Sequence, residues 1–324
     1  RSSLVGSEMC IRDRTIIDRE MIEASTAIEI PDLLRLVPGF QVAHATGSIF
    51  AAGYHGASDQ WPRRMEVMVD GRSVYMNSLA AVEWSALGLA IEDIERIEVV
   101  RGPNAPTFGS NAMLGSINIV TRAPFLMRGK YLRTTIGSQD TGNAVARWGG
   151  QIADWDVSLT GQYRSDDGFD DVDDHKRFQD LRFRGDYQAG SADAVSVQLG
   201  LTDGELGADG KLDPKKNTPF RDRDLRSHCQ QLTWTHNDAD GGRYRLALYH
   251  MDEVRWLGVG SEVDDYTRLD LKLTRNLRLG EGDGQLALIV HNLADDEYNE
   301  FRVPGRHDRY GNVFDRRVYL QLSL

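Results

Sequence analysis

The second half of the chain is dominated by residues that alternate between apolar and polar. In residues 155–164, Trp155, Val157 and Leu159 alternate with aspartate, serine and threonine, and a similar pattern returns in residues 194–202. Successive side chains of a β-strand point to opposite faces, so this pattern predicts strands with one apolar face. A chain with such strands must either bury that face or place it in lipid.

The same pattern predicts about ten strands, joined by connections of two kinds. The strands are expected near residues 128–137, 142–151, 155–164, 178–189, 194–202, 227–238, 242–252, 265–278, 284–292 and 315–324. Short turns lie near residues 153–154, 190–192, 239–242 and 280–284, whereas the connections 165–177, 203–226 and 293–314 are longer and charged. Short turns at one end and long loops at the other are typical of outer-membrane barrels.

The alternation alone leaves open which way the apolar face points. A water-soluble β-sandwich has the same alternation with its apolar side inward. A transmembrane helix is excluded, because no window of about 18 apolar residues exists.

Residues 15–125 have a different pattern, which predicts a mixed α/β unit. Asp18 is placed to cap a short helix, and a second helix is expected from Pro31 to the stop at Pro38-Gly39. Asp70-Gly71 is a strong signal for a hairpin between two strands. Residues 1–14 have no period, and we expect a disordered or extraneous end without a secretory leader.

Four ordered segments in this unit resemble the plug domain of TonB-dependent outer-membrane receptors. They are Ile30–Phe40 (IPDLLRLVPGF), Glu66–Val74 (EVMVDGRSV), Asp93–Pro103 (DIERIEVVRGP) and Asn118–Thr121 (NIVT). The resemblance implies an α+β plug domain over residues 15–125, followed by antiparallel transmembrane β-barrel strands over residues 126–324.

The family barrel has about 22 strands, and a closed barrel of about ten would be too narrow to hold a plug. We therefore expect an open or incomplete barrel, with an internal deletion near residues 255–264.

The resemblance also implies a function. Such receptors lie in the outer membrane of Gram-negative bacteria and take up a scarce small-molecule chelate, such as a ferric siderophore. The expected partners are the TonB-ExbB-ExbD energising complex and outer-membrane lipid, and the chain is expected to be a monomer. The first residues do not resemble a TonB box. We therefore expect a shortened receptor that the TonB complex does not energise. The alternatives are a binding-only outer-membrane protein and a secreted soluble β-rich binding protein.

Two groups of site residues follow from the resemblance. In the family, two plug arginines bind barrel carboxylates and lock the plug; Arg101 matches one, and His55 stands where the other is usual. The loops expected to face outward carry candidate contacts to an anionic or aromatic ligand: Trp61, Arg63, Arg64, Arg72, Tyr75 and Trp84.

An acidic loop supplies the only metal candidates, and they are weak ones. Asp170, Asp171, Asp173 and Asp174 lie close together in sequence and offer hard oxygen ligands. Their spacing fits no fixed metal-binding pattern, so a solvated loop is favoured.

Other function classes are excluded by what the sequence lacks. The net charge of -11 argues against a nucleic-acid partner. The two cysteines are far apart, and no motif of a hydrolase or a metalloprotease is present. We therefore expect neither enzymatic activity nor a cofactor.

Overall fold

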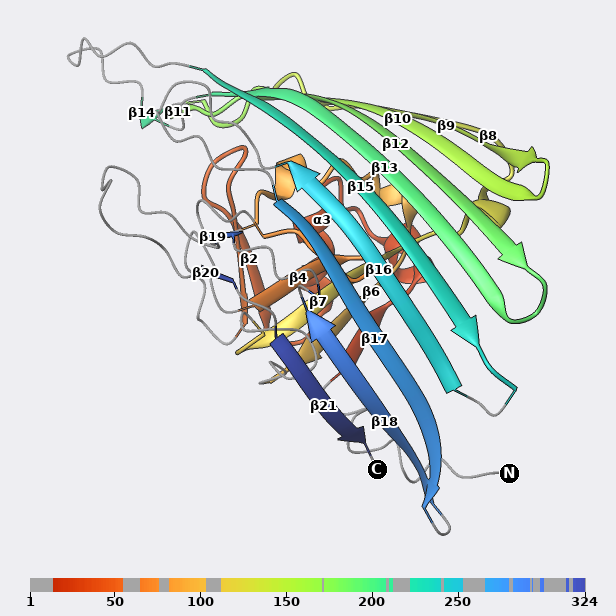
Figure 1. Ribbon diagram of the computed structural model, residues 1–324. Helices are drawn as coiled ribbons and strands as arrows, with labels where there is room; N and C mark the ends of the chain where they lie inside the picture. The colour runs from red at the N-terminus through yellow and green to blue at the C-terminus, as the bar shows by residue number, and fades with distance from the viewer. Residues whose placement is uncertain are drawn as a thin grey trace.

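The computed structural model contains two large β-sheets that lie against each other, and three two-stranded ones (Figure 1). It describes residues 14–54, 65–75, 82–102, 112–170, 172–207, 210–211, 222–239, 242–252, 266–279, 282–291, 293, 298–299, 313–314 and 317–323. The sequence expectations for residues 1–13 and for the deletion near residues 255–264 lie outside these ranges.

The N-terminal unit, from β1 to β7, is built on a five-stranded sheet in the order β1-β6-β7-β4-β5. Its strands are β1 (Arg14–Ile17), β4 (Met65–Val69), β5 (Arg72–Ser73), β6 (Ile94–Arg101) and β7 (Gly115–Thr121). β4 and β7 are parallel, and the other pairs are antiparallel. A separate hairpin joins β2 (Phe40–His44) to β3 (Phe50–Tyr54).

Short helices connect these strands, and their ends follow the sequence signals. They are α2 (Arg19–Ala24), α3 (Ile30–Leu33), η1 (Leu34–Leu36), η2 (Trp84–Ala86) and η3 (Ile91–Asp93). The Asp18 carboxylate caps α2 by accepting from the Met21 amide at 2.9 Å, as predicted. The second predicted helix is α-helical only to Leu33 and continues as a 3₁₀ turn.

The predicted Asp70-Gly71 hairpin is present between β4 and β5. Both turn residues have positive φ, 51° for Asp70 and 83° for Gly71. This backbone suits the aspartate-glycine pair and is strained for most other residues.

The hydrophobic core lies within the N-terminal unit. Its fully buried side chains include Ile17, Leu33, Leu34, Ile94, Ile97, Ile117 and Ile119. One face of the five-stranded sheet and the apolar sides of the helices supply this core, so the unit has a folded interior of its own.

The second sheet contains ten antiparallel strands, and each strand pairs with its neighbours along the chain. They are β8 (Gly129–Ile136), β9 (Gly142–Ile152), β10 (Trp155–Asp166), β12 (Lys176–Ala189), β13 (Asp193–Leu206), β15 (Arg223–Asn237), β16 (Gly242–Asp252), β17 (Tyr266–Leu279), β18 (Gly282–His291) and β21 (Arg317–Ser323). The ten predicted strands are confirmed.

The ten-stranded sheet is open and curved, and the N-terminal unit lies on its concave side (Figure 1). Among the described strands, β8 and β21 form its two ends and do not pair with each other. The expectation of an open, incomplete barrel is therefore confirmed. Because the sheet does not close, the narrow width of a ten-stranded barrel does not exclude the N-terminal unit.

The apolar face of this sheet points outward, away from the N-terminal unit. Leu201 is 56% exposed, whereas the next residue, Thr202, is 6% exposed and faces inward. Exposed outward residues include Leu159, Tyr163, Leu181, Leu199, Leu232 and Leu248, and buried inward residues include Ser158, Thr160, Gln162, Gln198 and Gln231. This arrangement is the reverse of a soluble protein and matches a sheet that faces lipid.

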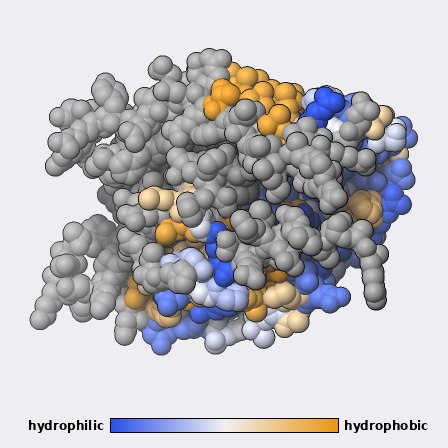
Figure 2. All heavy atoms as spheres, turned by 90° about the horizontal axis from the view of Figure 1, so that it is seen from below, coloured by the Kyte–Doolittle hydropathy of each residue, from blue (hydrophilic) through white to orange (hydrophobic). Residues whose placement is uncertain are grey.

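Seen from below, the molecule exposes a group of hydrophobic residues at its edge, next to strongly hydrophilic residues (Figure 2). Within the described ranges, no helix is long and apolar enough to cross a membrane.

Candidate functional site at the sheet interface

The N-terminal unit meets the concave face of the ten-stranded sheet through buried ion pairs. The first cluster joins η3 to β9. Arg147 donates to the Asp93 carboxylate at 2.7 Å, and the two side chains are only 7% and 5% exposed. Arg133 on β8 donates to Glu92 at 3.0 Å. A 3₁₀ turn of the N-terminal unit is thus held by two strands of the sheet.

A second cluster lies at the start of β12. The Lys176 ammonium donates to Glu29 at 2.7 Å and to the Gly47 carbonyl at 2.9 Å. Arg164 donates to the Ser85 carbonyl at 2.8 Å and to Asp180 of the neighbouring strand at 2.9 Å. Both cations therefore connect the sheet to backbone carbonyls of the N-terminal unit.

The third cluster surrounds the Asp70-Gly71 turn. The Asp70 carboxylate accepts from the Thr121 amide at 2.9 Å, from its hydroxyl at 2.6 Å, and from Gln198 at 2.9 Å. Arg182 lies 3.7 Å from the same carboxylate, and Arg245 donates to the Asp70 carbonyl at 2.9 Å. The β4–β5 turn is therefore held by strands β12, β13 and β16.

The charge state of Asp70 depends on this cluster. Burial alone would raise the pKa of its carboxyl, but Arg184, Arg182 and the two bonds from Thr121 outweigh burial and lower the pKa. The carboxylate therefore stays ionised while the two parts are in contact.

The lock predicted by resemblance is only partly within the described residues. Arg101 lies at the end of β6, partly buried and paired with Gly115, and His55 lies outside the described ranges. The resemblance implied plug arginines on barrel carboxylates, whereas the clusters above place sheet cations on carboxylates of the N-terminal unit. The Arg101–His55 lock stays a prediction.

Lys176 lies in the predicted connection 165–177, so the alternation gives no signal for it. The other sheet cations occupy positions within predicted strands, where alternation does not distinguish a cation that binds the N-terminal unit from one that faces water.

The predicted ligand contacts have different positions in the structure. Tyr75 and Trp84 are 5% and 4% exposed and belong to the hydrophobic core of the N-terminal unit. The Tyr75 hydroxyl donates to the Met65 carbonyl, and burial raises its pKa. Arg72 is buried, with its Nη1 2.7 Å from the Met251 sulfur. The remaining candidates, Trp61, Arg63 and Arg64, lie outside the described residues.

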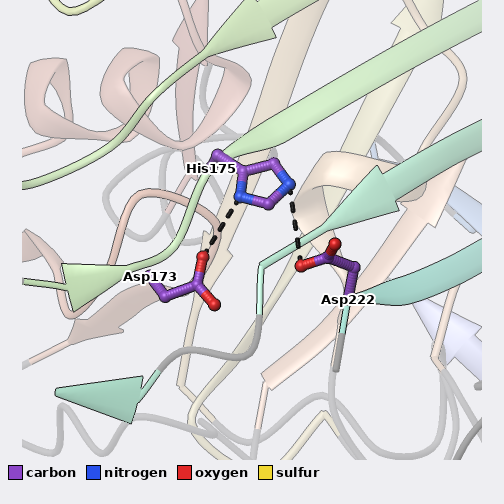
Figure 3. Close-up of side chains that lie close together, drawn as sticks. All are labelled: Asp173, His175 and Asp222. Carbon is purple, nitrogen blue, oxygen red and sulfur yellow. Dashed lines mark hydrogen bonds and ion pairs between the residues drawn. The ribbon is translucent and has the colours of Figure 1, made fainter. Parts of the chain in front are cut away.

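One of the four predicted aspartates, Asp173, lies close to two other possible metal ligands, His175 and Asp222 (Figure 3). The two nitrogens of His175 lie 3.3 Å from Asp173 and 3.9 Å from Asp222. One ligand atom from each of the three residues lies within 4.8 Å of the others, a spacing that could hold a metal ion.

Asp174 has a structural position instead. Its carboxylate is buried and accepts from the amides of Gly47 at 2.6 Å and Phe169 at 2.9 Å. Asp170 lies within the described ranges and Asp171 outside them. The weak metal assignment to these four aspartates stays a prediction.

Comparisons with known proteins agree with this architecture. The family described as TonB-dependent Receptor Plug Domain matches residues 11–116. The vitamin B12 transporter BtuB of Vibrio vulnificus is 29% identical over 167 residues, which is 49% of this chain and 26% of the relative. BtuB of Vibrio cholerae is 35% identical over 135 residues, or 40% of this chain and 21% of the relative.

Solved structures share the fold of both parts. The ferripyoverdine receptor of Pseudomonas aeruginosa aligns with a TM-score of 0.67 at 13% identity, covering 95% of this chain and 48% of the receptor. The ferric citrate transporter FecA aligns with a TM-score of 0.65 at 16% identity, covering 86% of this chain and 46% of FecA.

The chain thus spans about a quarter of the length of its BtuB relatives. These relatives are named as transporters, and the solved structures are named as a transporter and an outer-membrane receptor. By its matched plug segment, its open sheet of strands and its outward apolar face, the chain is similar to the TonB-dependent receptors of the Gram-negative outer membrane.

Proposed function

We propose that this chain belongs to a receptor for TonB-dependent uptake of a scarce small-molecule chelate, such as a ferric siderophore. The observation that carries the proposal is the two-sided sheet: its apolar side faces outward, and its polar side holds the N-terminal unit through ion pairs. An apolar exterior suits lipid, and a polar interface can exchange its partners for water when a plug moves. The relatives transport vitamin B12, and several structural neighbours are siderophore receptors.

We further propose the domain division and the partners. In this proposal, residues 1–14 are a disordered or extraneous end, residues 15–125 are the plug, and residues 126–324 are a partial barrel with an internal deletion near residues 255–264. The TonB-ExbB-ExbD complex would act on the plug, and the ligand-contacting candidates Trp61, Arg63 and Arg64 would face the outside.

The ten described strands of the sheet lie on one side of the plug, which supports our proposal that this chain is a shortened receptor. We expect it to bind substrate without transporting it. The outward leucines argue against the alternative of a secreted soluble protein, because a soluble protein would bury these side chains.

The first experiment tests the membrane assignment. The chain, expressed with an outer-membrane targeting signal, should stay in the membrane fraction until detergent is added. Release into buffer without detergent would contradict the membrane reading.

The second experiment tests transport in cells that lack their own receptors, with labelled cyanocobalamin and ferric siderophores as probes. We expect no uptake by this chain, and TonB-dependent uptake when the missing strands are supplied from a relative at residues 255–264. Robust uptake by the unmodified chain would overturn the shortened-receptor view. Substrate binding by the strand-completed receptor without uptake would favour a binding-only protein.

A further inference from the structure

A histidine lies among three carboxylates at the end of the ten-stranded sheet that carries the long connections. Asp173 and His175 belong to the connection between β10 and β12, and Asp222 lies just before β15. The His175 ring lies between the two aspartates, with Nδ1 3.3 Å from Asp173 and Nε2 3.9 Å from Asp222 (Figure 3). Glu205, on β13, lies 3.6 Å from the same Nε2. Two connections far apart in the sequence therefore place four possible metal ligands together.

Backbone bonds hold these two connections in place. β11 (Val172–Asp173) pairs with β14 (Gly210–Lys211). The Gly207 amide donates to the His175 carbonyl at 2.8 Å. Arg223, the first residue of β15, donates to the Gly207 carbonyl at 3.0 and 2.8 Å. Because these bonds do not use the side chains of the cluster, the ligand groups are preorganised and remain available.

The charge and the donor atoms of the cluster suit a transition metal. Asp173, Glu205 and Asp222 carry three negative charges, and among the described residues their ion pairs are all with His175. A divalent cation would balance two of these charges. Imidazole and carboxylate together are zinc ligands, whereas calcium takes six to eight oxygen atoms. Whichever ring nitrogen binds the metal, the other has a carboxylate near it to accept its proton, as metal-bound histidines usually do.

We propose that Asp173, His175 and Asp222 bind a divalent first-row transition metal such as Zn²⁺, with Glu205 beside the site. Each of the three offers one ligand atom, and these atoms lie within 4.8 Å of one another. In a tetrahedral zinc site, bonds of about 2.0–2.2 Å place the ligand atoms roughly 3.3–3.6 Å apart, so rotations of these side chains would close the site around the ion. The metal would join the two long connections to each other.

The metal site adjoins a contact with the plug. His175 stands between Asp174 and Lys176, which are both buried, whereas His175 is 20% exposed. Asp174 accepts from the Gly47 amide at 2.6 Å, and Lys176 donates to the Gly47 carbonyl at 2.9 Å. A metal on His175 would therefore restrain, from its outer side, the segment that holds the plug at Gly47. The inference does not depend on the transport function proposed above.

The proposal is tested by calorimetric titration of the full chain in detergent micelles with ZnCl₂ and, separately, CaCl₂. We expect one Zn²⁺ to bind per chain, at least about tenfold more tightly than Ca²⁺. Asp222→Asn and His175→Gln should each weaken Zn²⁺ binding by about tenfold or more. Asp222 is 51% exposed, so its variant should fold, and circular dichroism checks this. If His175→Gln does not fold, the Asp222→Asn variant decides.

The matched control is His236→Gln, at the end of the sheet with the short turns. His236 Nδ1 lies 2.9 Å from Asp193, but among the described residues this pair has no third metal ligand. Its loss should leave Zn²⁺ binding unchanged. Hydrogen exchange of the Gly47 amide gives a second measurement: Zn²⁺ should slow this exchange several-fold in the wild type and not in Asp222→Asn.

Three results would refute the site: no saturable Zn²⁺ binding by the wild type, equal affinities for Zn²⁺ and Ca²⁺, or full Zn²⁺ affinity in folded Asp222→Asn. An equal loss of affinity in His236→Gln would also count against it, because the metal would then lie elsewhere. Unchanged exchange at Gly47 on Zn²⁺ binding would contradict the link between the metal and the plug.

Discussion

Replacing Arg147 with alanine should loosen the plug from the sheet. The Arg147–Asp93 pair is 2.7 Å long, and its side chains are 7% and 5% exposed. Removing one partner of a buried pair leaves the other charge buried and unpaired, which costs about 3–5 kcal/mol. We expect a loss of this size in the free energy that holds the plug in place.

The chain contains a matched control for this change. Arg128 and Asp156 form a pair of similar length, 2.6 Å, but their side chains are 54% and 26% exposed. Because water screens such a pair, Arg128→Ala should cost about 0–1 kcal/mol.

The assay is a urea titration of the full chain in micelles, followed by protection of the plug from protease. With a urea dependence of about 1–3 kcal/mol per molar, Arg147→Ala should lower the midpoint by roughly 1–5 M, and Arg128→Ala by less than about 1 M. A double-mutant cycle with Asp93→Ala should give a coupling energy of about 1–3 kcal/mol. Equal shifts for the two arginine variants, or no coupling, would refute the role assigned to this buried pair.

Three further predictions concern other parts of the molecule. Asp70 has a lowered pKa in the folded chain, so its stabilising contribution is complete above its ordinary pKa and is lost as the pH falls below about 4. The urea midpoint should therefore fall more between pH 7 and pH 3 in the wild type than in the Asp70→Asn variant. Leu201→Arg places a charge on the outward face and should cost about 2–4 kcal/mol on folding into lipid vesicles, whereas a water-facing Leu201 would tolerate the change. Asp174→Ala removes the acceptor of the Gly47 and Phe169 amides, at about 1–3 kcal/mol each, and both amides should then exchange hydrogen markedly faster; unchanged exchange would contradict the tethering of the two loops by Asp174.

The strands could be predicted from the sequence because their signal is local. Alternation over residues 242–252 gave both ends of β16, and Asp18 marked the start of α2. The orientation of the apolar face could not be predicted, because alternation is the same for either orientation. Only the position of the plug on the concave side identifies the inward side.

The contacts between the plug and the ten-stranded sheet could not be predicted from local sequence patterns either. Lys176 and Glu29 are 147 positions apart in the chain, and nothing near either residue indicates the other. Trp84 was predicted as a ligand contact because its segment looked like a loop, yet its ring lies in the plug core. Loop composition indicates exposure of a segment, but the direction of one large side chain depends on tertiary packing.

The strictly sequential order of the ten-stranded sheet has a consequence for how such proteins change in length. Each of the ten strands pairs only with the strand before it and the strand after it in the sheet. Removing one hairpin therefore brings together two strands that keep their directions and can pair again with the same register rules. A meander of this kind can gain or lose one hairpin, which is two strands, without disturbing the plug contacts elsewhere on the sheet.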